Sequence, residues 1–282
     1  MSIVAYAPDD LTVTVTADTT LAALQQHLAP RDQWLPVDPP NPARLTIGEI
    51  VDGNLSGPRR YGYGTVREHV LSLRAALADG RVIKSGASVV KNAAGYDLCR
   101  LFTGARGDLA TVREACFKVQ PRPEVEYFGK AEFSTATAAC EFVEKLDTSE
   151  LTPMVLDLHN AGGAGMWTVV VGFAGTREEV DWQRKQAGSL AALADANLDY
   201  NELFGSGTTI ANPLRKLSVL PSKLAATIAA MRGVTSLVAR AGNGVIYYRG
   251  EDQGIGLAPS LKLMQRLKHE FDPANHLHTR PE

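Results

Sequence analysis

The residues with the most chemical promise in this chain are proline and glycine loops, not acids, bases or nucleophiles. Pro36–Pro40 (PVDPP) is stiff, because a residue that precedes proline is forced into an extended conformation. Thr46–Gly48 follows and presents backbone amides. Four further glycines carry no Cβ atom to block the close approach of a ligand: Gly53, Gly57, Gly62 and Gly64.

Two later segments extend this series of loops. Lys91–Asp97 (KNAAGYD) leads into the expected start of a helix, and Gly104–Gly107 (GARG) follows it. Together the loops could wrap an extended, flat, many-atom ligand mainly through their backbone. The alternative that the residues leave open is an irregular, loop-rich surface.

Other conspicuous patterns predict no site. Gly162–Gly165 precedes a strand instead of a helix, so it lacks the geometry of a dinucleotide fingerprint and indicates a hairpin turn. Gly205–Thr209 has no P-loop lysine and is typical of a flexible loop. His276 and His278 have no cysteine or carboxylate partner at ligand spacing, so we expect a solvated pair and no metal. HExxH and GxSxG motifs are absent.

Composition limits the remaining classes. The chain has 282 residues, 45% hydrophobic and 21% charged, which suits one large or two modest globular domains. The formal net charge of -2 gives no general electrostatic reason to expect nucleic acid or a membrane surface as partner. The sequence shows neither a signal peptide nor a long apolar run, and we expect no direct membrane insertion. Three cysteines without a CxxC pair favour free thiols and a cytoplasmic location.

The first part of the chain alternates short elements with loops. Leu11–Ala17 alternates apolar and polar residues as a half-buried strand does. Thr19 or Thr20 can cap a short helix that Pro30 ends, and Asp97 can cap another over Leu98–Phe102. Three strands are also expected in this part: 69–76 and 81–85, joined at a hairpin turn at Asp79–Gly80, and 110–119.

A dense group of prolines near residue 121 indicates a domain boundary, after which the elements become longer. A helix capped by Ser134 is expected there, with Ala139, Phe142, Val143 and Leu146 on its apolar face. The other expected helices cover 177–196, the residues after Pro221, and 258–271. The expected strands are 126–133, 154–159, 167–173, 214–220, 236–240 and 244–249. We therefore predict α+β domains at 1–122 and 123–250, with a C-terminal helix and tail at 251–282 that return toward the first domain.

The order of motifs resembles a known family. PVDPP, TIGE, NLSGPRR, KNAAGYD and a closing strand that ends in K-V-x-P resemble the FAD-binding domain of the FAD-linked oxidases, of the vanillyl-alcohol oxidase type. Within that family the motifs are most similar to the E subunits of bacterial glycolate oxidases. The resemblance implies a truncated FAD-binding domain plus an α+β, ferredoxin-like cap domain.

The resemblance also implies where FAD would lie. Pro36, Asp38 and Pro39 would pass along the flavin, and Thr46, Ile47 and Gly48 would supply backbone donors near the ring and ribityl chain. Residues from two later loops complete the implied non-covalent site: Asn54, Ser56 and Gly57 in the same cleft, and Gly104, Gly107 and Val112 near the adenosine half.

Three departures from the family pattern weaken the expected binding of FAD. The chain begins at the strand after the family's usual phosphate-binding unit, so we expect that loop to be absent. Glu49 stands where the family has a second glycine, and a carboxylate there would repel an anionic pyrophosphate unless it pointed away. Asp108 and Ala110 replace a threonine and a glycine. Arg59 and Arg60 could compensate if they faced the phosphates; otherwise they lie on a solvated loop or at a subunit contact.

Two functions follow. The first is an FAD-dependent oxidoreductase subunit that helps to oxidise a 2-hydroxy acid, in a complex with a larger flavin subunit and an iron–sulfur subunit. The second is an FAD-free structural or assembly subunit derived from the same fold. No catalytic residue can be named from the sequence, because His159, Tyr247 and Arg249 are as well explained as ordinary strand residues.

Overall fold

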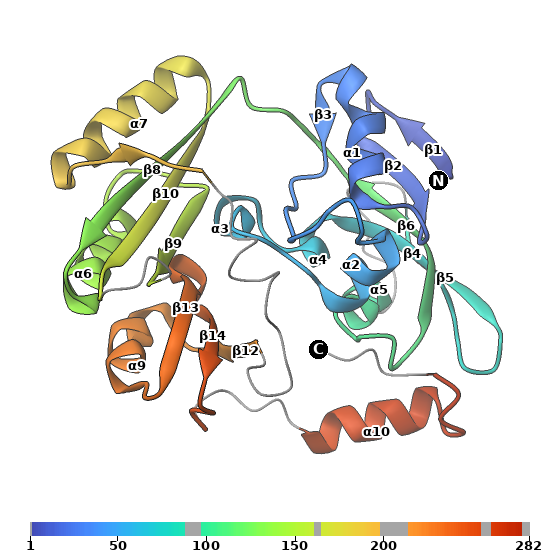
Figure 1. Ribbon diagram of the computed structural model, residues 1–282. Coiled ribbons are helices and arrows are strands. Elements are labelled where there is room, and N and C mark those ends of the chain that lie inside the picture. The colour runs from blue at the N-terminus through green and yellow to red at the C-terminus, as the bar shows by residue number, and fades with distance from the viewer. Residues whose placement is uncertain (1, 88–96, 161–164, 198–213, 255–260, 278–282) are drawn as a thin grey trace. The chain divides into compact units, whose positions relative to one another are not determined.

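The computed structural model describes residues 2–87, 97–160, 165–197, 214–254 and 261–277 (Figure 1). Their contacts divide into two compact units. Unit 1 consists of the described residues in 1–57, 63–122 and 258–282, and unit 2 of those in 58–62 and 123–257. The chain therefore passes into unit 2 for five residues, Pro58–Gly62, long before the main part of that unit begins at Pro123.

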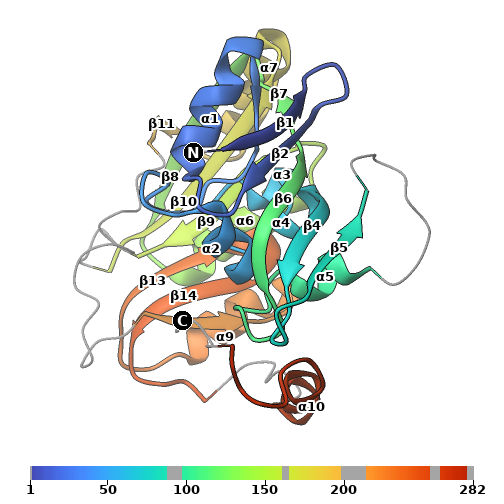
Figure 2. The same ribbon diagram turned by 90° about the vertical axis from the view of Figure 1, so that its right-hand side faces the viewer.

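A five-stranded antiparallel sheet forms the centre of unit 1, and Figure 2 shows its strands side by side. The predicted alternation is confirmed, because Val13 and Val15 are 1% and 0% exposed while Thr14 between them is partly open to solvent. In sheet order the strands are β1 (Ile3–Ala7), β2 (Thr12–Thr16), β6 (Thr111–Lys118), β4 (Val70–Ala76) and β5 (Val82–Gly86).

The hairpin between β4 and β5 also forms as predicted. Gly80 has a positive φ of 84°, and the amide of Arg81 donates to the Asp79 carboxylate at 3.0 Å. A separate two-stranded ladder joins β3 (Gln33–Trp34) to β7 (Gln120–Pro121).

Two predicted caps of unit 1 are confirmed. Thr20 caps α1 (Leu21–Leu28), which continues into a short 3-10 turn (Ala29–Arg31), and Asp97 caps α5 (Leu98–Phe102). The predicted C-terminal helix is described as α10 (Leu261–Phe271), and its Leu267 and Phe271 pack on the core of unit 1.

The glycine loops that follow Thr46 contain regular structure. Three short helices form between Thr46 and His69, and two of them begin with a capping box in which Thr46 or Thr65 pairs with a glutamate three residues later. The T-x-x-E spacing was visible in the sequence and could have predicted two of them. The helices are α2 (Ile47–Gly53), α3 (Arg60–Tyr63) and α4 (Val66–His69).

Unit 2 is built on a seven-stranded antiparallel sheet. Among the described residues, the helices that accompany it include α6 (Ala136–Asp147), α7 (Arg177–Leu190) and α9 (Leu224–Ala230), the last after a 3-10 turn (Pro221–Lys223). In sheet order the strands are β11 (Ala194–Asp195), β8 (Val125–Phe133), β10 (Trp167–Gly175), β9 (Val155–His159), β13 (Val234–Arg240), β14 (Val245–Gly250) and β12 (Arg215–Ser218).

The α6 helix buries the predicted apolar face, but Thr135 caps it instead of Ser134. Its buried residues belong to one core cluster with residues of the sheet that include Leu156, Val171 and Phe173. The helix expected over 177–196 ends at Leu190, and β11 follows it. The glycine segments at 162–165 and 205–209 and most of KNAAGYD lie outside the described residues, apart from Gly165 and Asp97.

Within the described residues, no helix combines the length and the apolar character that crossing a membrane requires.

Candidate functional site

The proline segment and the NLSG loop come together in unit 1. A Cβ atom placed on Gly57 would overlap the carbonyl oxygen of Asp38, so only glycine allows this contact. Pro36 and Pro39 are buried beside a half-buried Asp38. The structure thus joins two of the predicted site segments, although Gly57 serves chain packing and not the approach of a ligand.

The glycine loop at 104–107 lies against the same part of unit 1. Asn54 ends α2 in a left-handed conformation (φ 46°), and its side-chain oxygen accepts the amide of Arg67 at 3.1 Å. A Cβ on Gly104 would lie 3.2 Å from the Cβ of Asn54, and the amide of Gly104 donates to Val51 at 2.9 Å. Gly107 is buried with a φ of 81°, so this loop packs at the C-terminal end of α2.

Ser56 carries an unsatisfied polar group in this region. Its hydroxyl oxygen is buried and has no hydrogen-bond partner among the described residues. A buried hydroxyl without a partner costs about 1–3 kcal/mol, and a ligand that bonds to it removes that penalty. The loop Asn54–Gly57 therefore has one polar group ready for a ligand.

The N-terminal end of α2 differs from the prediction. Thr46, Ile47 and Gly48 were expected to offer backbone donors, but all three amides already donate within the chain. Ile47 donates to Thr19 at 2.8 Å, and Gly48 donates to Ala17 at 2.8 Å. The Thr46 amide donates to the Glu49 carboxylate at 2.9 Å. These donors are used by the fold.

Glu49 has a local task in the structure. Its carboxylate accepts from the amide and the hydroxyl of Thr46, the latter at 2.8 Å, and so completes the cap of α2. The concern that Glu49 repels a pyrophosphate is answered in part, since the carboxylate is directed at its own helix terminus.

Ile47 and Val112 contribute to the hydrophobic core of unit 1, where they are 0% and 4% exposed. Their side chains therefore do not line a site. Neither Arg59 nor Arg60 belongs to unit 1, because the chain has entered unit 2 at Pro58. Arg59 makes a two-pronged ion pair with Glu126 of β8 at 2.7 and 3.0 Å.

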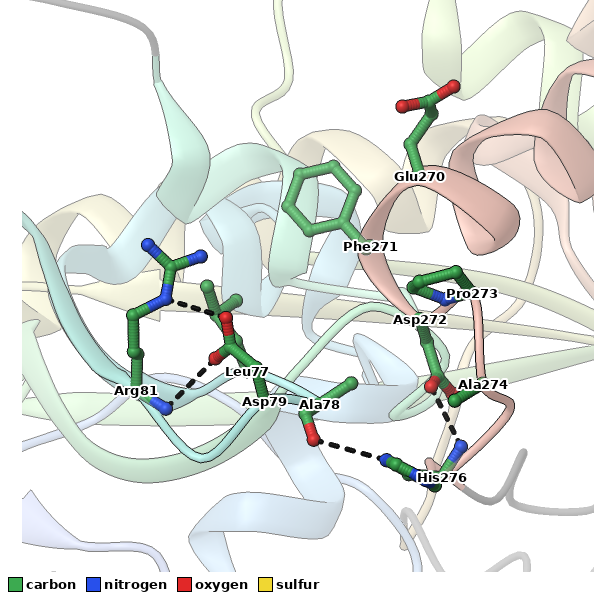
Figure 3. A pocket seen from close by; sticks show the side chains of 10 residues that line it. All are labelled: Leu77, Ala78, Asp79, Arg81, Glu270, Phe271, Asp272, Pro273, Ala274 and His276. Carbon is green, nitrogen blue, oxygen red and sulfur yellow. Dashed lines mark hydrogen bonds and ion pairs between the residues drawn. The ribbon is translucent and has the colours of Figure 1, made fainter.

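A pocket of about 390 Å³ lies elsewhere in unit 1, between the β4–β5 turn and the end of α10. Figure 3 shows Asp79 paired with Arg81 on one side, and His276 close to the carbonyl of Ala78. Asp79 is paired with Arg81, and Asp272 accepts hydrogen bonds from Lys268 and His276. Burial alone would raise the pKa of Asp272, but bonds from Lys268, Leu277 and His276 lower that pKa to about 2.

The described residues hold no group of three or more metal-ligating side chains. Cys99, Cys116 and Cys140 are free and buried, and burial raises the pKa of the Cys99 and Cys140 thiols, the latter to about 11. The Cys99 and Cys140 thiols are therefore poor nucleophiles. The candidate site is one for binding a ligand.

Comparison with known proteins defines the class. Residues 1–86 match the family described as FAD binding domain. This match agrees with the FAD-binding motifs predicted for this part of the chain, and FAD is the cofactor of such a domain.

Among curated proteins, the chain is similar to glycolate oxidase subunit GlcE of Escherichia coli (strain K12). The two are 38% identical over 143 residues, which cover 50% of this chain and 41% of that protein. Glycolate oxidase subunit GlcD of Bacillus subtilis (strain 168) is 32% identical over 149 residues, covering 53% and 32%. The D-lactate dehydrogenase of Archaeoglobus fulgidus is 42% identical over 86 residues, covering 30% and 19%. The chain thus spans less than half the length of these relatives.

Two solved structures of alkyldihydroxyacetonephosphate synthase share the fold. Each matches 99% of this chain and 65% of its own, with TM-scores of 0.70 and 0.72 at 15% identity. Similarity at that identity concerns the fold alone.

The two ends of α2 fit FAD differently. The unsatisfied Ser56 hydroxyl, in a loop pressed against Asp38, fits a polar edge of the cofactor. The amides of Thr46–Gly48 do not fit the donor role, because the chain uses them itself. The loop at the C-terminal end of α2 is therefore the part of the predicted site where a hydrogen bond to FAD would satisfy an unpaired polar group.

Proposed function

We propose that the chain is an FAD-carrying subunit of a glycolate-oxidase-type complex that oxidises a 2-hydroxy acid. The observation that carries this proposal is the buried, unsatisfied hydroxyl of Ser56 in the NLSG loop. Bound FAD would supply the electron acceptor, while the protein binds and orients it. Ser56 would donate to or accept from a polar atom of the cofactor.

The other predicted residues divide into two groups under this proposal. Asp38, Asn54, Gly57 and Gly104 shape the loops around Ser56 and keep its hydroxyl in place. Thr46, Ile47, Gly48 and Val112 support those loops from the helix terminus and the core, without touching the cofactor.

The proposal extends to partners, supported by the names of the relatives as subunits. A larger flavin subunit and an iron–sulfur subunit would complete the complex and pass electrons onward. A cytoplasmic location belongs to the same proposal, and the three free cysteines support it because they suit a reducing compartment.

A Ser56→Ala variant tests the flavin role by two readouts of opposite sign. We expect FAD affinity to fall about fivefold, the size of one neutral hydrogen bond, in an absorbance titration followed by gel filtration. The melting temperature of the flavin-free variant should stay the same or rise, because the change removes a polar group that has no partner.

Ser149→Ala is the matched control for this test. The Ser149 hydroxyl donates to Leu146 at 2.7 Å in unit 2, so its loss should lower stability and leave FAD affinity unchanged. A wild-type protein that stays colourless and shows no saturable FAD binding would refute the proposal.

One observation favours a second function, that of an FAD-free assembly subunit. The chain satisfies the amides of Thr46–Gly48 by itself, as a relic fold with no cofactor would. Recovery of a colourless native complex, with no FAD on this chain by native mass spectrometry, would decide for this alternative.

A further inference from the structure

A recess of about 570 Å³ lies at the start of α7 in unit 2, where that helix follows β10 (Figure 1). We name it the α7 recess: it is lined by Thr152, by Ala174 of β10, and by residues at the start of α7 between Thr176 and Gln183. Its volume is typical of a site for an organic group and is many times that of one water molecule.

Hydrogen bonds hold the walls of the α7 recess in place. Gln183 is 6% exposed, and its Oε1 atom accepts from the amide of Thr152 at 2.9 Å and from the hydroxyl of the same residue at 3.1 Å. The first turn of α7 is fixed by a capping box, in which Glu179 accepts from the amide and the hydroxyl of Thr176. The shape of the recess is therefore set by the protein itself.

A large aromatic side chain at the α7 recess is open to solvent. Trp182 is 46% exposed, although Val180 and Ala187 of the same helix are buried in the core of unit 2. Tryptophan is enriched at protein interfaces, where a partner covers its large surface. The face of its ring is also the best aromatic surface for a cation.

The charged groups that line the α7 recess are two carboxylates, Glu178 and Glu179. The Glu179 carboxylate is used by the cap of its own helix. Glu178 lies one turn before Trp182 on the same face of α7, at the i, i+4 spacing that makes two helical side chains neighbours. It is exposed, and the described part of the chain offers its carboxylate no ion-pair or hydrogen-bond partner. The recess is therefore complementary in charge to a cation.

The combination of an aromatic ring with a carboxylate occurs twice elsewhere in unit 2, each time with an arginine. Arg59 forms its two-pronged ion pair with Glu126, and its guanidinium lies 5.3 Å from the ring centre of Phe128. Arg184 lies 4.6 Å from the ring centre of Tyr127 and pairs with a carboxylate of β11 at 3.5 Å. The α7 recess presents the ring and the carboxylate of this arrangement, and no arginine is among its described lining residues.

We propose that the α7 recess is a docking site for a partner protein and takes an arginine side chain of that partner. The guanidinium stacks on the ring of Trp182 and pairs with the carboxylate of Glu178. Arginine suits these two groups better than lysine does, because its planar guanidinium both stacks on an aromatic ring and matches the two oxygens of a carboxylate. The rest of the recess accommodates the residues that flank this arginine.

This docking site goes beyond the proposed function, because it consists of unit 2 residues alone and does not require bound flavin. The two proposals can fail separately. FAD titration of Ser56→Ala tests unit 1, and peptide binding by the flavin-free protein tests the α7 recess.

The experiment titrates the capped tripeptide acetyl-Gly-Arg-Gly-amide into the ¹⁵N-labelled full chain without added FAD, at constant ionic strength. The backbone amides of Thr152 and Ala174, which line the recess and remain in every variant, report binding by their NMR chemical shifts. We expect saturable shifts with the arginine peptide. A peptide with citrulline in place of arginine has nearly the same shape but no charge, and it should bind at least about fivefold more weakly.

Two variants remove the two contacts one at a time. Glu178→Gln and Trp182→Leu should each weaken binding of the arginine peptide about threefold to fivefold, the effect of an exposed ion pair or cation–π contact. Glu141→Gln is the matched control, because it removes an exposed carboxylate of α6 that does not line the recess, and it should leave the affinity unchanged. Melting temperatures equal to that of the wild type would show that the variants keep the fold.

Three results would overturn the proposal in different ways. Wild-type protein without saturable shifts, or folded Glu178→Gln and Trp182→Leu variants that bind as tightly as wild type, would show that the recess is not a docking site. Equal affinity for the citrulline peptide would remove the role of charge. Free methylguanidinium that binds as tightly as the arginine peptide would replace the partner protein with a small organic cation.

Discussion

The two units of this protein use their polar groups in opposite ways. In unit 1 the loops around α2 use their own backbone: the amides of Thr46–Gly48 are bonded within the chain, and Gly57 is pressed against Asp38. In unit 2 the sheet uses charged side chains, and buried Arg240 pairs with Asp157 of the neighbouring strand. We therefore expect unit 1 to lose stability when a substitution moves its loop backbone, and unit 2 to lose stability when a substitution removes a charge.

The buried pair in unit 2 should give the largest effect. Asp157→Ala leaves Arg240 without its carboxylate in a place where that side chain is 5% exposed, and we expect a loss of about 3–5 kcal/mol in unfolding free energy. Chemical denaturation measures it.

Asp157→Leu combined with Arg240→Met is the matched test, because it removes both charges and should recover most of the loss. A single variant as stable as wild type would mean that the sheet of unit 2 does not depend on this pair, and the contrast between the units would disappear.

Gly57→Ala tests the backbone of unit 1. The new Cβ would overlap the carbonyl of Asp38, so the loop must shift, and we expect a loss of about 3 kcal/mol together with lost FAD affinity.

Gly188→Ala is the control of opposite sign. It sits in α7 with no atom within 4 Å of the added Cβ, so it should stabilise the protein by about 0.5–1 kcal/mol. If Gly57→Ala were as harmless as Gly188→Ala, the packing of the NLSG loop on the PVDPP segment would be wrong.

The sequence predicted regular elements better than it predicted the roles of the loops. Alternation in Thr12–Thr16 and the caps at Thr20 and Asp97 depend on near neighbours, so local patterns suffice to find them. The glycines of the loops were read as room for a ligand. That Gly57 meets Asp38 depends on a contact between residues nineteen apart, which spacing alone does not reveal.

The buried charges in the sheet of unit 2 were missed for a different reason. Tyr247, Arg249 and His159 were noticed but treated as ordinary strand residues, since no motif connects them. A charged residue inside an apolar strand, such as Asp157 in VLDLH, was the available signal. The passage of Pro58–Gly62 into unit 2 could not be foreseen, because nothing in NLSGPRRYG marks the point at which the chain leaves one unit for the other.

The smallest effect we predict is a dependence on pH, and it compares one buried histidine in each unit. Burial is the main cause that lowers the pKa of His69 in unit 1, with Lys118 acting in the same direction and the Tyr63 carbonyl and Glu68 against it. Burial also lowers the pKa of His159 in unit 2, helped by Lys130 and Arg240. Both residues therefore take up a proton more readily in the unfolded chain.

The sign of the effect follows from that difference. Above the ordinary histidine pKa of about 6.5 neither form is protonated and stability is full, and as the pH falls below that value the unfolded state gains protons that the native state does not. Each histidine can then remove at most about 1.4 kcal/mol per pH unit. Denaturant titrations between about pH 7 and pH 5 should show a smaller acid loss for His69→Phe than for wild type, with His269→Gln on the exposed side of α10 as the control. An equal slope in His69→Phe would mean that the unsatisfied Nε2 of His69 is reached by water, and that unit 1 is less closed around its loops than its buried backbone implies.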